Sequence, residues 1–327
     1  MRSRKIHISR SSNRIRVGIT MGDPSGIGAE VTARALSSLG SIADFTIIGD
    51  ASVFSKAASS LRRKLTCDFV DLHNVRCKGF SFGKIKAEYG KASVEYLEKA
   101  MDLLKGKQLD CLVTAPISKE ALSLAGIPVG GHTEYLVRAT SAKNAVMLLL
   151  NKFLKISLLT RHLPLQQVSP SIHKGLIKET LLLTRNALTS LFLIRKPRIV
   201  ICGLNPHASD NGVLGPEENR VIIPALKGMR KEGKTVDGPL SADVALYKLL
   251  RKEYDAAIAM YHDQALIALK LLDASSGVNM TLGLPFVRTS PLHGTAFDIA
   301  GKGCASPLSM QAAIQTAIQC CANLKNA

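Results

Sequence analysis

Short apolar runs alternate along the chain with segments in which apolar residues recur at helical spacing. The runs have the length of buried strands and cover residues 16–20, 45–49, 111–115, 145–150, 154–160, 198–203 and 256–261. The helical spacing recurs in four segments, 91–104, 217–232, 241–253 and 306–324. This alternation predicts an α/β fold whose strands are covered on both faces and are largely parallel.

The length of 327 residues corresponds to about two domains of ordinary size. No internal repeat or low-complexity linker marks a boundary between them. Residues 1–16 carry six basic residues and no acidic one, which predicts a basic, flexible tail. This segment has no apolar stretch of the kind found in secretion signals.

No apolar run approaches the ~18 residues that a membrane helix needs, so we expect no membrane segment. The seven cysteines are odd in number, scattered, and without CxxC spacing. Such cysteines are typical of buried thiols rather than of a disulfide framework or a zinc ribbon. A cytoplasmic protein is therefore expected.

The net charge of +18 is concentrated in residues 1–16 and 151–200. A nucleic-acid-binding protein would place its basic residues on one face, with stacking aromatics or a recognisable module. Aromatic residues make up only 5% of the chain, tryptophan is absent, and we find no such module. The charge favours anionic small molecules such as phosphates. Binding to nucleic acid or to an anionic surface stays open as an alternative of a different class.

Three histidines, His162, His207 and His262, stand just beyond predicted strands. Ligands of open α/β sheets collect outside the carboxyl ends of strands, and three imidazoles there would suit a divalent metal with a coordination position left for substrate. Asp263, beside His262, and Asp243 could orient an imidazole or bind the metal directly. The alternative to a metal site is that the three histidines are structural and that Asp243 only caps a helix.

Two glycine-containing segments are candidate ligand loops. The first, ITMGDPSGIGAE at 19–30, combines a strand, a tight turn and a helix N-terminus that could bind an anion. It matches neither GxGxxG nor GxxxxGK[ST], so no Rossmann fingerprint is present, and a simple turn explains it equally well. The second, SPLHGTAFDIAGKG at 290–303, is long and non-periodic, as functional loops often are.

A further polar group contains the residue types that a phosphate with a neighbouring polar group requires. Its members are His132, Thr133, Lys270, Asn279 and Arg288. Arginine would bind a phosphate by forked hydrogen bonds, and lysine as a point charge. Taken singly, each cation could also be a solvated surface charge.

Taken together, these segments resemble the 4-hydroxythreonine-4-phosphate dehydrogenase family of vitamin B6 biosynthesis. The matching strings run in one order from residue 19 to 303: ITMGDPSGIGAE, VTAPISKEAL, GHTEYL, RHLPL, GLNPHASDNG, GPLSAD, YHDQ, GVNMTLGLPFVRTS and HGTAFDIAGKG. The basic N-terminal extension, the basic excess of 151–200 and CASPLSM at 304–310 depart from the family's pattern.

The resemblance implies a fold like that of the isocitrate and isopropylmalate dehydrogenases, which binds NAD without a Rossmann turn. Two α/β/α domains with a cleft between them are expected, the first from 17–128 with 298–327 and the second from 129–297. The resemblance also implies a homodimer whose active site lies at the interface, with metal ligands from both subunits.

The resemblance assigns a role to each candidate residue. His162, His207 and His262 become ligands of one divalent metal (Zn, Mg or Co), and His132, Thr133, Lys270, Asn279 and Arg288 become substrate contacts. His293, Gly294, Thr295 and Asp298 become candidates for binding NAD or NADP. Asp243 and Asp263 are the catalytic candidates, and His132 is a further candidate for the general base.

The expected reaction is oxidation of 4-phosphooxy-L-threonine by NAD, followed by decarboxylation to 3-amino-2-oxopropyl phosphate. A metal would assist both steps. The same set of residues would serve a sister enzyme that oxidises threonate or erythronate 4-phosphate, or a dihydrodiol carboxylate. The motifs do not separate these substrates.

Overall fold

The structure is a computed structural model, and it describes residues 14–59, 61, 65–128, 130–231 and 235–326. Residues 1–13 of the predicted tail therefore lie outside the described residues. The chain divides into two compact units. One contains the chain up to Gly131 together with His293–Ile318, and the other contains His132–Leu292 and the residues from Gln319 onward.

The first unit is built on four parallel strands in the order β3-β2-β1-β4. Their bounds are β1 (Arg16–Thr20), β2 (Asp44–Gly49), β3 (Asp68–Asp71) and β4 (Cys111–Thr114). The helices of this unit are α1 (Gly28–Leu39), α2 (Ala51–Ala57), α3 (Ala87–Lys105) and α4 (Lys119–Leu124), and α11 (Leu308–Asn326) begins in it. Strands β1 and β4 are buried along almost their whole length, as parallel strands with helices on both faces are.

The second unit holds seven strands in the order β11-β10-β5-β6-β9-β7-β8. Their bounds are β5 (Val146–Leu150), β6 (Lys155–Leu158), β7 (Ile199–Cys202), β8 (Asp237–Leu240), β9 (Ala256–Ala259), β10 (Val278–Leu282) and β11 (Val287–Pro291). Strands β6, β9, β7 and β8 run parallel to one another. The pairs β5–β6, β5–β10 and β10–β11 are antiparallel. Most described strand pairs are parallel, as predicted, and these three are the exceptions. Residues 151–154 and 283–286 form short turns, which can join only antiparallel strands, and this accounts for the pairs β5–β6 and β10–β11.

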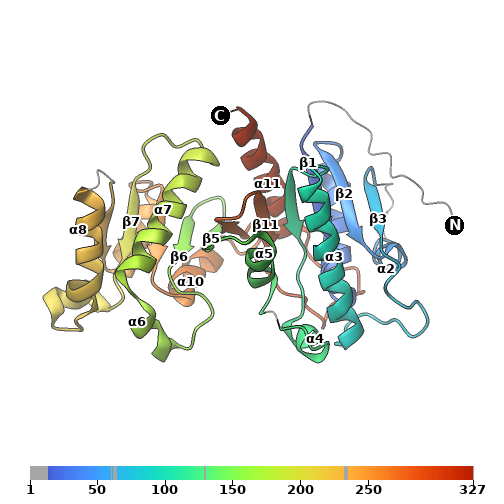
Figure 1. Ribbon diagram of the computed structural model, residues 1–327, viewed down its shortest axis with the longest axis horizontal. Coiled ribbons are helices and arrows are strands. Elements are labelled where there is room, and N and C mark those ends of the chain that lie inside the picture. The colour runs from blue at the N-terminus through green and yellow to red at the C-terminus, as the bar shows by residue number, and fades with distance from the viewer. Residues whose placement is uncertain (1–13, 60, 62–64, 129, 232–234, 327) are drawn as a thin grey trace. The chain divides into compact units, whose positions relative to one another are not determined.

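Helices cover both faces of this second sheet (Figure 1). Their bounds are α5 (His132–Thr140), α6 (Val168–Ser171), α7 (Lys174–Ser190), α8 (Ile223–Lys231), α9 (Ala242–Leu250) and α10 (His262–Asp273), with short turns η1 (Leu165–Gln167), η2 (Pro206–Gly212) and η3 (Glu218–Ile222). Leu181 of α7 and Leu226 of α8 belong to one core cluster with Ile199 and Ile201 of β7. The alternate residues of β7, Val200 and Cys202, belong to a second cluster that contains residues of α9 and α10. The α/β class predicted from the alternation is confirmed.

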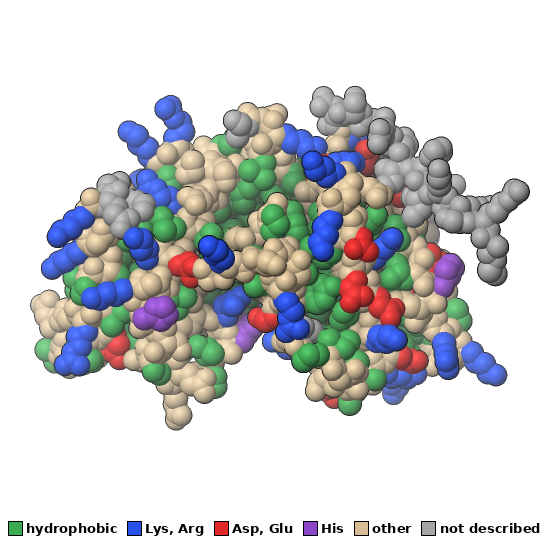
Figure 2. All heavy atoms as spheres, viewed as in Figure 1, with side chains coloured by type: hydrophobic (Ala, Val, Ile, Leu, Met, Phe, Trp, Pro, Cys, Tyr) green, Lys and Arg blue, Asp and Glu red, His purple; other side chains and the backbone are tan. Residues whose placement is uncertain are grey.

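The charged surface shows no continuous basic patch on the face drawn in Figure 2, where Lys and Arg side chains stand apart with acidic side chains among them. Several basic residues are paired, such as Arg16 with Asp110 at 2.8 Å and Lys152 with Asp273 at 3.2 Å. Among the described residues, no helix combines the length and the hydropathy needed to cross a membrane.

Candidate active site

Four candidate residues follow four neighbouring strands of the second unit at the same edge of the sheet. His162 follows β6, His262 follows β9, His207 follows β7 and Asp243 follows β8. These strands are adjacent and parallel, so their carboxyl ends lie at one edge. This is the edge at which ligands of open α/β sheets bind.

Two of the three histidines lie side by side. The ring centroids of His162 and His262 are 5.5 Å apart. Two imidazoles that bind one tetrahedral ion have centroids about 5 Å apart, so this pair fits a shared divalent metal. Nδ1 of His262 is hydrogen-bonded to Oδ1 of Asp263 at 2.6 Å, which leaves Nε2 of the ring for a ligand.

His207 lies in η2, whose backbone is left-handed from His207 to Asn211, with a φ of 53° at His207. Buried Glu218 supports the start of this loop, because its Oε1 accepts hydrogen bonds from the amides of Leu204 and Asn205, both at 2.8 Å. Non-glycine residues hold such a conformation only where the surroundings impose it. The strained backbone at His207 is therefore a built feature of the loop.

Asp243 stands in the first turn of α9, within electrostatic reach of His207. The Ser241 hydroxyl and the Val244 amide donate to its carboxylate and, with the charge of His207, lower the pKa of Asp243. Asp243 lies in the first turn of α9 but does not cap it, because Ser241 is the N-cap residue. Its role as the partner of an imidazole or as a metal ligand stays a prediction. Within the described part of the chain, no three His, Cys, Asp or Glu side chains converge closely enough to hold a metal. The role of His207 as a third ligand stays a prediction.

The predicted phosphate-binding residues are centred on Arg288 of β11, which is only 2% exposed. Its Nη1 donates to Oγ1 of Thr281 on β10 at 2.9 Å. Burial lowers the pKa of Arg288 to about 10, and the carboxylate of Glu134 opposes that shift. The guanidinium therefore keeps its charge at neutral pH although it is buried.

Asn279 and Thr281 share one face of β10. In the register with β5 they pair with Leu149 and Met147, which belong to the core cluster covered by α9 and α10. Lys270 is exposed on α10, eight residues after His262 and thus about 12 Å further along the helix axis. The structure therefore places Asn279, Thr281 and the helix of Lys270 on one face of the sheet.

His132 begins α5, and Thr133 beside it is buried. Burial and then the charge of Arg288 lower the pKa of His132 well below its ordinary value, so its imidazole is neutral at pH 7. Nε2 of His132 and Oδ1 of Asn279 are buried without a hydrogen-bond partner within the described residues. Buried polar atoms in this condition are typical of sites that receive a ligand or an ordered water.

The candidate cofactor residues lie in the first unit, in the segment between β11 and α11. Nδ1 of His293 is 3.0 Å from the carbonyl oxygen of Gly294, and burial lowers the pKa of His293. The carbonyl oxygen of Thr295 accepts from the amide of Ile27 at 2.9 Å. The glycine turn of 19–30 thus packs against this loop and uses one of its amides to hold the loop rather than to bind an anion.

Sequence reasoning missed Thr281, which accepts a hydrogen bond from Arg288, and Glu134, whose carboxylate favours the charged form of Arg288. Thr281 carried a usable signal, because it alternates with Asn279 in a run that flanks Arg288. Glu134 carried none, since its effect on Arg288 depends on how α5 packs.

Residues 31–317 match the family model described as pyridoxal phosphate biosynthetic protein PdxA. The chain is 43% identical over 323 residues to the 4-hydroxythreonine-4-phosphate dehydrogenase of Sulfurihydrogenibium sp. (strain YO3AOP1), covering 93% of this chain and 98% of that relative. It is 38% identical over 318 residues to the D-threonate 4-phosphate dehydrogenase of Cupriavidus necator, covering 91% and 95%. The crystal structure of 4-hydroxythreonine-4-phosphate dehydrogenase from Klebsiella pneumoniae superposes with a TM-score of 0.85 at 32% identity, covering 95% of this chain and 99% of that one.

Proposed function

The chain belongs to the family of the pyridoxal phosphate biosynthetic protein PdxA, and from this we propose that it oxidises 4-phosphooxy-L-threonine with NAD and decarboxylates the product. Relatives named as dehydrogenases make it an oxidoreductase. The observation that carries the proposal is the buried, charged Arg288 beside the neutral His132. A doubly anionic substrate with a hydroxyl group needs such a pair.

Arg288 binds an anionic group of the substrate, and Thr281 holds the guanidinium in place. Burial of this cation favours an anionic ligand, because desolvation by the protein destabilises the charged guanidinium. Asn279 and Thr133 offer polar atoms to the hydroxyl and amino groups of the substrate, and Lys270 adds a point charge.

His132 accepts a hydrogen bond from a substrate hydroxyl through its neutral imidazole. A ring that stays neutral at pH 7 offers a lone pair throughout the physiological range. The lowered pKa of Asp243 makes that carboxylate a weak base, so we assign it to electrostatic support of His207.

His162 and His262 would hold a divalent metal, with His207 as the proposed third ligand and Asp263 orienting His262. Such a metal, when bound, supplies a Lewis acid for negative charge on substrate oxygen. NAD or NADP, when bound, accepts the hydride, and His293, Gly294, Thr295 and Asp298 are the proposed contacts. The substrate loses hydride and a hydroxyl proton to give a β-keto acid. This acid then loses carbon dioxide and takes up a proton at the carbon that carried the carboxylate, which gives 3-amino-2-oxopropyl phosphate.

We also propose that the protein forms a homodimer with the active site at the interface. Helix α10 carries both His262 and Lys270, and it exposes Ile267 by 61% and Leu271 by 83%. Tyr247 of α9 is 61% exposed. Large apolar side chains on the helix that bears the site favour coverage by a second copy. Sedimentation of the purified protein at twice the chain mass would support the homodimer, and an active monomer would contradict it.

The deciding experiment follows NADH formation with 4-phosphooxy-L-threonine in the presence of Zn²⁺, Mg²⁺ or Co²⁺. We expect turnover with release of carbon dioxide. A His207→Ala variant should lose both turnover and bound metal while it keeps its fold. Absence of NADH or NADPH formation with every metal, or full activity after metal removal, would contradict the proposal.

D-Threonate 4-phosphate is the second candidate substrate, because the relative from Cupriavidus necator is almost as similar to this chain. The two substrates differ in the group beside the carboxylate, which is an amine in one and a hydroxyl in the other. Comparison of kcat/KM for the two, with erythronate 4-phosphate as a third, separates these enzymes. Strong, salt-dependent retention of the core on DNA would instead support the nucleic-acid alternative.

A further inference from the structure

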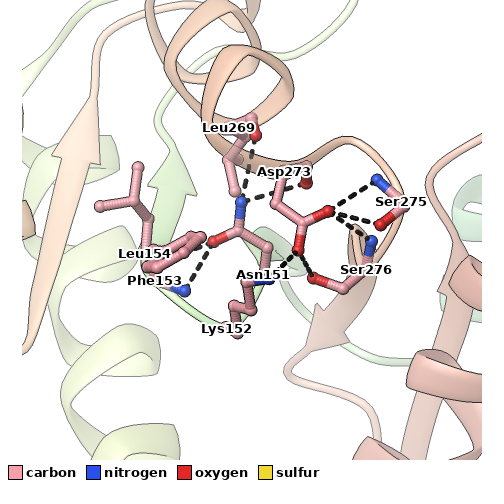
Figure 3. A network of polar contacts seen from close by, with 8 residues as sticks. All are labelled: Asn151, Lys152, Phe153, Leu154, Leu269, Asp273, Ser275 and Ser276. Carbon is pink, nitrogen blue, oxygen red and sulfur yellow. Dashed lines mark hydrogen bonds and ion pairs between the residues drawn. The ribbon is translucent and has the colours of Figure 1, made fainter.

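Asn151 lies in the turn between β5 and β6, and its single amide group makes four hydrogen bonds (Figure 3). Its Oδ1 accepts from the amides of Phe153 and Leu154, both at 2.9 Å. Its Nδ2 donates to the carbonyl oxygens of Leu269 at 3.1 Å and Asp273 at 3.3 Å. An amide has two N–H donors and two acceptor lone pairs, so the capacity of Asn151 is fully used.

Both carbonyl groups belong to the last turns of α10. The final carbonyl groups of a helix have no intrahelical partners. A glycine in the left-handed conformation after the helix often lets backbone amides bond these carbonyls. Helix α10 has no such glycine, because Ala274 follows it with a φ of −70°. The hydrogen bond from Asn151 to the carbonyl oxygen of Asp273 performs part of this task, although Asn151 lies in a strand turn 122 residues away in sequence.

The carboxylate of Asp273 completes the connection. It accepts from the amide and hydroxyl of Ser275 at 3.0 and 2.6 Å and from the hydroxyl of Ser276 at 2.7 Å. Lys152 lies 3.2 Å from it, but the lysine side chain is 64% exposed and contributes little. Asn151, which is only 7% exposed, is thus the buried attachment of this helix end.

Helix α10 carries two residues of the candidate active site, His262 in its first turn and Lys270 next to Leu269. Leu269 and Asp273 are four residues apart and lie on one face of the helix. Bonds to both carbonyls fix the rotation of the helix about its axis as well as its position along the axis. We infer that Asn151 is a positioning residue that places Lys270 for substrate binding by anchoring the end of α10. This inference rests on the proposed function of Lys270.

The test uses Asn151→Asp. The new carboxylate still accepts from Phe153 and Leu154, so the turn is kept, but its second oxygen faces the carbonyl oxygens of Leu269 and Asp273 and repels them. If this variant does not fold, Asn151→Ser replaces it, because a serine hydroxyl can still accept within the turn but is too short to reach α10.

Asn323→Asp is the matched control. Nδ2 of Asn323 donates to the carbonyl oxygen of Leu191 at the end of α7, and its Oδ1 accepts from Gln319 at 2.9 Å. The same substitution therefore breaks the same kind of bond at a helix that carries no candidate site residue. This control variant shows how far the loss of a helix-end hydrogen bond by itself changes hydrogen exchange and KM.

Two readouts are needed, amide hydrogen exchange over residues 262–273 and the KM for 4-phosphooxy-L-threonine. Asn151→Asp should speed exchange over this helix by about tenfold and raise KM by about tenfold, with the KM for NAD unchanged. Asn323→Asp should change neither. In the Lys270→Ala background, Asn151→Asp should raise KM no further, because it acts through Lys270.

Unchanged exchange over 262–273, or effects of the two substitutions on KM that multiply, would overturn the inference. The outcome is separable from failure of the proposed function. If Lys270→Ala leaves KM at the wild-type value, the substrate role of Lys270 is wrong and the positioning inference fails with it. If the wild-type protein does not oxidise the substrate at all, the exchange data alone still decide whether Asn151 anchors the helix.

Discussion

Arg288 and Thr281 face each other across the hairpin of β10 and β11, with Nη1 of the arginine 2.9 Å from Oγ1 of the threonine. The threonine fixes one arm of a buried guanidinium, which limits the conformations that this side chain can adopt. This geometry differs from that of a surface arginine, whose side chain must lose conformational freedom when it binds. A preorganised cation at the base of the site follows from the register of two short strands.

Arg288→Lys should raise the KM for the phosphorylated substrate by at least about tenfold, because lysine cannot form the bidentate contact and bond Thr281 at once. Steady-state kinetics with varied substrate measure this. Arg198→Lys is the control, since Arg198 pairs with Asp255 on the surface at 3.3 Å. Equal KM values for the two variants would refute an anion-binding role for Arg288.

Asp23 should make folding stability depend on pH below neutrality. Burial raises the pKa of Asp23 to about 6, while its Oδ1 accepts from the Ser25 amide at 2.9 Å. The folded state therefore holds a proton that the unfolded state has lost between about pH 4 and 6. The contribution of Asp23 to stability is present at low pH and is lost as the pH rises through about 6.

Asp23→Asn removes this titration and keeps the acceptor for Ser25. Urea denaturation of the wild type and the variant at pH 5 and pH 8 measures the difference. The contribution of Asp23 to the free energy of unfolding of the wild type should fall by about 1.4 kcal/mol between these pH values. The reason is that between pH 5 and pH 6 only the folded state still holds this proton. An identical pH dependence in both proteins would show that Asp23 is ionised throughout.

Asp263→Asn should weaken metal binding by about 10- to 100-fold. The carboxylate bonds Nδ1 of His262 at 2.6 Å and holds the ring for coordination through Nε2. Titration of the metal-free protein with Co²⁺, followed by its absorption spectrum, gives the affinity without an activity assay. Glu253→Gln, which removes a surface carboxylate paired with Lys248, is the control. Equal affinity in both variants would mean that Asp263 does not support a metal ligand.

The strands that the sequence predicts are the buried ones. All seven apolar runs form strands, namely β1, β2, β4, β5, β6, β7 and β9, and such runs are typical of strands that are covered on both faces. The strands without such runs are β3, β8, β10 and β11. Strands β3 and β8 lie at the two ends of the strand order and are only partly buried. Strands β10 and β11 are buried but carry polar residues such as Thr281 and Arg288, which interrupt the apolar pattern. Edge strands can carry polar residues, so composition does not reveal them.

The candidate site likewise contains features that the sequence predicts and features that it does not. That His162, His207 and His262 reach one sheet edge follows from their position after parallel strands. The contact of Arg288 with Thr281 depends on a strand register, and the bonds of Asn151 depend on where the end of α10 lies. The sequence therefore offers Arg288 as a candidate but does not predict its contact with Thr281, and only the structure reveals the role of Asn151.

Gly26 should influence cofactor binding through the loop that contains Thr295. A Cβ at Gly26 would lie 3.1 Å from the carbonyl oxygen of Thr295, so the loop must shift by a few tenths of an ångström to admit it. The neighbouring amide of Ile27 bonds that carbonyl at 2.9 Å, which couples the shift to the whole loop. Gly26→Ala should therefore raise the KM for NAD several-fold and leave the KM for the phosphorylated substrate unchanged. Gly228→Ala is the matched control, because Gly228 lies in α8 with no atom within 4 Å of the added Cβ. If Gly26→Ala binds NAD as tightly as this control, residues 293–298 do not contact the cofactor.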